Sequence, residues 1–137
     1  MRRAIPSLVA AAAVAVFGTI LLNAQASRKP SNLVEQLADR LDRGEPVLNY
    51  DPKFGYLPSL LKALDINVDS QVLVFSRTSL QQDHINPKNP RAIFFNDTVQ
   101  VGSVQNGKVF ELMAADADDG AKFYTLDMTR VEQPKMD

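Results

Sequence analysis

The stretch "TVQVGSVQNGKVFELMA" (residues 98–114) decides how this chain folds. Its two halves are rich in β-branched and other apolar residues, and Asn106-Gly107 stands between them. Asn-Gly between two such segments is the strongest short-range signal of a β-hairpin, because both residues tolerate the positive φ of a type I′ turn. If the residues on either side of this turn pair, Val101 lies opposite Leu112. This register predicts one row of side chains facing the core: Val99, Val101, Phe110, Leu112 and Ala114.

The segments around this hairpin complete the predicted fold. Compact apolar runs, rich in β-branched and aromatic residues, predict further strands at 71–76, 91–96 and 121–128. Leucines at helical spacing predict two earlier helices, in "NLVEQLADRLDRG" (32–44) and "LPSLLKALDI" (57–66). The sequence therefore predicts an α+β fold, with two N-terminal helices packed on a mostly antiparallel β-meander of about five strands.

The first predicted helix begins with a capping signal. Asn32 is a favoured N-cap residue, and Glu35 follows three positions later, as in a capping box. We expect a single α+β domain over residues 32–128, preceded by a short linker (27–31) and followed by a disordered polar tail (129–137).

The N-terminal segment has the layout of a secretory signal peptide. A basic start, an uncharged run from Ala4 to Leu22 and the small residues Ala24 and Ala26 predict a signal peptide over residues 1–26. The alternative is an uncleaved N-terminal anchor, with membrane association through residues 4–22. Both alternatives predict an exported protein, either periplasmic or held in the inner membrane by its N-terminus.

Composition excludes several classes of function. The chain has 15 basic and 16 acidic residues, a formal net charge of −1, so it lacks the basic excess that attracts nucleic acid. It contains no cysteine, which excludes a covalent thioether haem, a zinc–thiolate site or an iron–sulfur cluster within this chain. We therefore expect no cofactor-binding and no metal-binding residues here.

The acidic stretch "DADDG" (116–120) raises the question of a calcium loop. An EF-hand needs oxygen ligands at its positions 1, 3 and 5, glycine at 6 and glutamate at 12. Starting the loop at Asp116 puts Gly120 at position 5, and placing Gly120 at position 6 starts the loop at Ala115. Neither register works, and strands flank the stretch, so a turn between strands is predicted.

No catalytic residue can be assigned. His84 is the only histidine and stands in the polar segment 77–90, beside Asp83, where a surface position is expected. No nucleophile elbow or clustered phosphate-binding glycines accompany it, so the chain is not expected to be an enzyme. Segment 77–90 is long for a loop inside a compact domain, and such loops often bind partners.

Four segments carry a resemblance to a known family. They are "GYLPSLLKALDI", "SQVLVFSRTSLQ", "NPRAIFFNDTVQVG" and "FELMAADADDGAKFYTLD", in this order between residues 55 and 127. Together they resemble the N-terminal part of a family of exported bacterial proteins related to multihaem c-type cytochromes. In that family, Cys-x-x-Cys-His haem-attachment motifs soon follow the strand that matches "FYTLD". Here "MTRVEQPKMD" (128–137) follows instead, so no haem-site residue can be carried over.

Two functions remain as expectations. The resemblance implies a non-catalytic exported module of a cytochrome-c-like electron-transfer protein, truncated and without its own haem, whereas related proteins carry haem c downstream. The alternative is a free-standing periplasmic protein-interaction domain, which would bind an unidentified protein partner through loop 77–90 or an open sheet edge.

Overall fold

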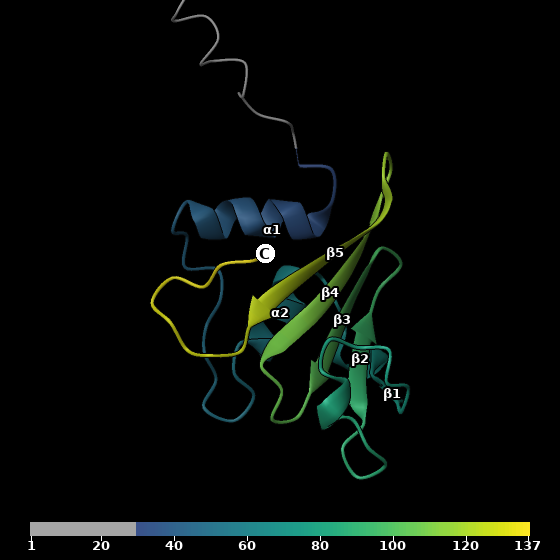
Figure 1. The fold of residues 1–137 in the computed structure, drawn as a ribbon. Helices are drawn as coiled ribbons and strands as arrows, with labels where there is room; N and C mark the ends of the chain where they lie inside the picture. Colours follow the sequence, from purple (N-terminus) through teal and green to yellow (C-terminus); the bar gives the residue numbers. More distant parts are fainter. Residues whose placement is uncertain (1–29) are drawn as a thin grey trace, which may run out of the picture.

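The computed structural model describes residues 30–137 (Figure 1). Two α-helices and two short 3₁₀-helices accompany five strands. In chain order they are α1 (Leu33–Asp42), α2 (Leu57–Ala63), η1 (Val68–Ser70), β1 (Val72–Val74), η2 (Gln82–His84), β2 (Arg91–Phe95), β3 (Val99–Val104), β4 (Val109–Asp116) and β5 (Gly120–Asp127).

The predicted signal peptide (1–26) and the first linker residues (27–29) lie outside the described part of the chain. The alternative anchor, residues 4–22, lies outside it as well. Among residues 30–137, no helix is long and apolar enough to cross a membrane.

The structure corrects the predicted fold class. All five strands form one antiparallel sheet in the order β1-β2-β3-β4-β5, and this sheet is the main element of the fold. The two helices are not an N-terminal pair packed on the sheet: α1 lies near the N-terminus, but α2 lies in the middle region of the chain, after residues 43–56. The leucine spacing misled because it shows that a segment has an apolar face and not where that face packs.

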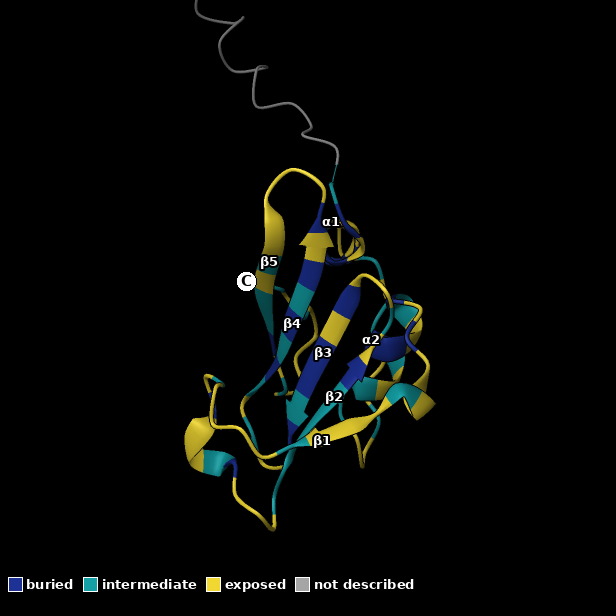
Figure 2. Cartoon of the chain, turned by 90° about the vertical axis from the view of Figure 1, so that its right-hand side faces the viewer, coloured by how far each residue is buried: buried dark blue, intermediate teal, exposed yellow. Residues whose placement is uncertain are grey.

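The hairpin register is confirmed. Val101 pairs with Leu112 and Val99 pairs with Ala114 in the β3–β4 ladder. The five residues predicted to face the core are all buried there: Val99, Val101, Phe110, Leu112 and Ala114. Figure 2 shows the resulting alternation of buried positions with half-buried or exposed ones along β3 and β4. The core also takes buried side chains from the two helices, among them Leu37 and Leu60.

The turn between these strands differs from the predicted type I′ turn. Asn106 has the positive φ of 62°, but Gly107 does not have a positive φ. The β3–β4 ladder ends at Gly102↔Glu111, before the turn is reached. The hairpin is present, but beside the turn a residue from another segment makes the hydrogen bonds to the beginning of β4.

That residue is Gln81, a buried residue of segment 77–90. Its carboxamide oxygen accepts hydrogen bonds from the backbone N–H groups of Lys108 and Val109, and its Nε2 donates to the Val109 carbonyl at 2.7 Å. The side chain thus acts as a short strand partner for β4. A Cβ on Gly107 would stand 2.3 Å from the Gln81 oxygen and 2.9 Å from the Val104 carbonyl oxygen. Glycine is needed here for a close approach and not for its φ.

Residues 129–137 differ from the predicted disordered tail. They turn back toward α1 and β5 (Figure 1). The Tyr56 hydroxyl bonds the backbone N–H and C=O of Val131, both at 3.0 Å. Farther on, the backbone groups of Thr125 and Asp137 exchange two hydrogen bonds of 2.8 and 3.0 Å. The apolar Met136 packs against the core. This contact could not be predicted, because the short polar segment has no periodic apolar pattern.

We predict that Gly107→Ala destabilises the domain. The added methyl group must displace the Gln81 carboxamide or the Val104 carbonyl, so we expect the free energy of unfolding to fall by about 1–3 kcal/mol. Urea unfolding followed by circular dichroism measures this change.

A double-mutant cycle with Gln81→Ala identifies the cause. Because the clash involves the Gln81 side chain, Gly107→Ala should cost less when that side chain has been shortened. Equal costs in both backgrounds, or no cost in either, would contradict the packing described here.

Candidate functional site

The acidic stretch at 116–120 forms the tip of the β4–β5 hairpin. Asp116 pairs with Gly120 across the turn, and the Asp116 Oδ1 accepts hydrogen bonds from the backbone N–H groups of Asp118 and Asp119, both at 3.0 Å. Gly120 has a φ of +79°, which suits glycine. The predicted turn is confirmed, and the first aspartate shapes it.

The second carboxylate oxygen of Asp116 faces α1 instead. It accepts hydrogen bonds from the Ser31 hydroxyl and from the Asn32 side-chain amide, the latter at 3.2 Å, and lies 3.0 Å from the Lys122 ammonium group. The Asp116 side chain is fully buried. This carboxylate therefore ties the beginning of α1 to the hairpin. Burial of a charge is tolerated here because every neighbour donates to it.

Asn32 and Glu35 cap α1 in a modified form of the predicted box. The Asn32 Oδ1 accepts from the backbone N–H groups of Val34 and Glu35, both at 3.0 Å, as expected of an N-cap. The Glu35 carboxylate reaches back to the backbone N–H of Ser31, at 2.7 Å, and not to that of Asn32. Its other oxygen pairs with the Lys122 ammonium group at 2.9 Å.

Lys122 is the centre of this charge cluster. Its ammonium group also lies 3.1 Å from the carboxylate of Asp119. The three carboxylates raise the pKa of Lys122, with the hydrogen bond to Glu35 as the largest cause. The bond from Lys122 is likewise the main reason that the pKa of Glu35 falls to about 2. The pKa of Asp116 is lowered first by the Ser31 hydroxyl and then by Lys122. Lowered carboxyl pKa values beside a raised lysine pKa are expected where ion pairs stabilise a fold, so we interpret this cluster as structural.

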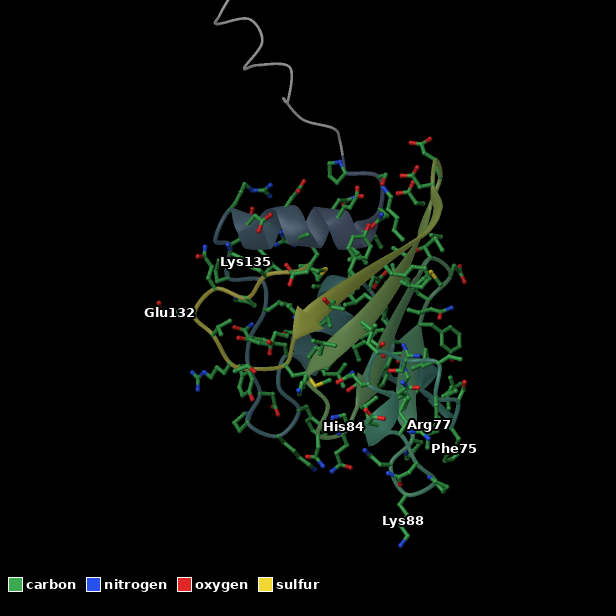
Figure 3. The ribbon with its side chains drawn as sticks, in the orientation of Figure 1. Phe75, Arg77, His84, Lys88, Glu132 and Lys135 are labelled. Atoms are coloured by element: carbon green, nitrogen blue, oxygen red, sulfur yellow. The ribbon has the colours of Figure 1, made fainter. Side chains whose placement is uncertain are left out.

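His84 lies at the end of η2, in the loop region that Figure 3 shows below the sheet. Its backbone carbonyl accepts a hydrogen bond from the Asn89 side chain at 2.8 Å. The neighbouring Asp83 pairs with Arg77 at 3.6 Å. Within residues 30–137, no group of three or more His, Asp or Glu side chains is placed to hold a metal ion. In the part of the chain that the structure describes, no nucleophile or carboxylate bonds the His84 imidazole.

Segment 77–90 is fastened to the outer face of the sheet. Besides Gln81, the Ser79 hydroxyl and the Leu80 backbone N–H both donate to the Glu111 carboxylate at 2.7 Å. Glu111 also pairs with Arg91, at 3.2 Å, over a hollow of about 700 Å³. The Glu111 carboxylate is thus occupied by three groups of the fold, whereas the buried Nε of Arg91 has no hydrogen-bond partner among the described residues. The long loop is part of the fold, and its anchoring does not favour it as the binding segment.

The two edges of the sheet are treated differently. On β5, the backbone of Thr125 is covered by its hydrogen bonds to Asp137. On β1 no further strand is present in the described chain, and both Val72 and Leu73 are exposed (Figure 2). Charged side chains and prolines usually protect such edges, but "QVLVFS" (71–76) has neither. The β1 edge is therefore open to another strand.

The direction of the free backbone groups can be inferred from β2. The Phe95 N–H points past the end of β1, where it donates to the Ser70 hydroxyl at 2.9 Å. Because backbone groups alternate along a strand, Ile93 also points toward β1 and bonds its partner Val72. The N–H and C=O of Leu73 must then point outward, away from β2. An added strand would bond to Leu73.

A groove runs beside this edge. It has a volume of about 1320 Å³ and lies between α2 with its flanking segments and the inner face of the sheet. Its wall includes exposed or half-buried apolar side chains, of which Phe54 and Leu73 are more than half exposed. Three lysines border it, namely Lys53, Lys62 and Lys88, whereas its only acidic residue is Asp65.

Sequence reasoning proposed an open edge as one of two binding surfaces but did not identify it, and it missed the groove. The signal for the edge was the absence of charge in 71–76. The groove had no signal, because its residues come from α2, four strands and several loops.

No family model, curated protein or solved structure matches the chain. The comparisons therefore provide no link to c-type cytochromes, and that resemblance stays a prediction. Function is therefore inferred from the open edge and the groove.

We predict that the charge cluster makes stability depend on acidic pH through Glu35. Its folded pKa of about 2 lies below the ordinary 4.5, so its contribution is present above about pH 4.5 and is lost as the pH falls toward 2. Glu35→Gln should lower the free energy of unfolding by about 1–3 kcal/mol at pH 7, and by much less at pH 2. Urea unfolding across this range measures the difference.

Glu132→Gln is the matched control, since it removes the same charge from an exposed side chain in the 129–137 segment (Figure 3). It should leave stability nearly unchanged at both pH values. If Glu35→Gln and Glu132→Gln behave alike, Glu35 does not anchor the helix.

Proposed function

We propose that this protein is a non-catalytic, exported protein-interaction module that binds an extended segment of a partner by strand addition to β1. The observation that carries the proposal is the open β1 edge, with the backbone of Leu73 directed outward. In strand addition, backbone hydrogen bonds supply affinity, and pockets for alternate side chains supply specificity. The groove beside Leu73 supplies such pockets.

The arrangement of the remaining polar groups supports a binding role. The buried charges near α1 and the ion pair of Arg91 with Glu111 hold segments of the fold together. The resemblance to the cytochrome-related family implies that this chain is itself a module of an exported electron-transfer protein, and its partner is not identified. We propose that this module, which has no haem of its own, binds that partner through the β1 edge.

We predict that Leu73→Pro abolishes strand addition. Proline removes the outward N–H that an added strand needs, and it is tolerated on an edge strand where that N–H faces solvent. Selection of a displayed random peptide library on the purified protein should enrich peptides that bind the wild type and lose binding to this variant. Hydrogen exchange should show the Leu73 amide becoming protected when such a peptide is bound.

Leu73→Ala is the matched control, because it shortens the same side chain but keeps the N–H. It should retain binding, weakened only by the lost apolar contact. Circular dichroism and thermal unfolding confirm that both variants are folded. Peptides that bind the proline variant as well as the alanine variant, or a library that yields no binder, would sink the proposal.

A further inference from the structure

We infer that the occupant of the groove is an extended acidic peptide segment, with apolar side chains that enter the groove and carboxylates that reach its lysines. This inference rests on the proposed strand addition at β1 and names the chemistry of the partner. Three observations carry it: the size of the groove, the charge along its border and its continuity with the open edge.

The size of the groove favours an extended chain. Sites for small molecules usually enclose about 300–1,000 Å³, and this groove exceeds that range at about 1320 Å³. Its apolar members include Phe54 on the turn before α2, Val68 in η1 and Leu73 on β1. All three are more than half exposed, at 54%, 62% and 56%. Apolar side chains of a partner would bury this surface.

The charge of the groove is opposite to that of the chain. Three lysines against one aspartate border it, in a protein with a formal net charge of −1. None of the three ammonium groups forms an ion pair within residues 30–137, whereas Lys122 contacts three carboxylates. The ammonium group of Lys53 lies over the Phe54 ring, 4.9 Å from its centroid. Lys62 stands on α2, and Lys88 extends from the loop below the sheet (Figure 3).

Continuity with β1 selects a peptide over other anionic, apolar ligands. Leu73 belongs to both features: its side chain lines the groove, and its backbone groups point out of the sheet edge. A strand added there places every second side chain over the inner face, beside the groove. A fatty acid also combines an apolar chain with a carboxylate, but it has no backbone N–H and C=O to pair with those of Leu73.

Synthetic peptides test the charge requirement. The probe is a short fluorescein-labelled peptide in which valine or isoleucine alternates with glutamate. Two control peptides carry glutamine or lysine in place of every glutamate. We expect the glutamate peptide to bind more tightly than the glutamine peptide, the lysine peptide to bind least, and the difference to shrink as salt is added. Fluorescence anisotropy on the purified protein measures the three affinities.

Lysine variants locate the charge. Lys62→Gln should weaken the glutamate peptide about two- to fivefold, as expected for one exposed ion pair, and leave the glutamine peptide unchanged. Lys135→Gln is the control of equal charge; Lys135 lies in the 129–137 segment and does not line the groove (Figure 3). It should leave both peptides unchanged. Both lysines are exposed, so neither variant is expected to impair folding.

The outcomes separate this inference from the proposed function. If peptides bind with dependence on the Leu73 N–H but without preference for glutamate or Lys62, strand addition stands and the acidic partner is overturned. If binding ignores Leu73→Pro, strand addition fails.

Two further results would replace the peptide with another occupant. Binding of laurate that depends on Lys62, with no peptide binding, would identify a small anionic amphiphile. A dimer detected by light scattering and lost in Leu73→Pro would identify a second copy of this chain. Either result overturns the inference.

Discussion

The pairing of β3 with β4 is the constraint on which the rest of this structure depends. With Val101 opposite Leu112, one face of the hairpin becomes a continuous apolar surface. A slip of one residue would turn every one of these side chains to the opposite face. Because the sheet is a meander, the neighbouring strands take their positions from this central pair. The same inner face of the sheet forms one wall of the groove.

Polar side chains complete this sheet where strand pairing ends. Gln81 substitutes for a strand at the beginning of β4, and the buried Asp116 joins the other end of β4 to α1. Each buried polar group found there has donors or acceptors close by, which makes its burial tolerable. The cluster around Lys122 is therefore understood as a structural clamp. The acidic stretch 116–120, which suggested a metal site, forms the β4–β5 turn and supplies two of the carboxylates that pair with Lys122.

The two edges of the sheet differ in whether their outward backbone groups are hydrogen-bonded. One edge receives backbone hydrogen bonds from Asp137, and the other ends in a strand with outward-facing backbone groups. An apolar groove bordered by lysines lies directly beside the second edge. The combination of free backbone groups and side-chain pockets is what strand-addition domains use for recognition.

The sequence by itself determined the local elements. The Asn-Gly turn and the alternation around it predicted the central hairpin and its buried row, and Asn32 predicted the beginning of α1. These features are local because turn geometry, alternation and capping depend on residues a few positions apart. The sequence did not predict the detailed turn type, in which only Asn106 has a positive φ, or the hydrogen bonds that Gln81 of a distant segment makes beside the turn.

Only the tertiary structure decided the arrangement of these elements. The helix signals located α1 and α2 along the chain but could not show what either helix packs against, because an apolar face does not specify its partner. The pairing of Lys122 with Glu35, the return of Asp137 to β5 and the groove all join residues far apart in sequence. Such contacts follow from how the sheet folds the chain back on itself, and no short-range pattern encodes them.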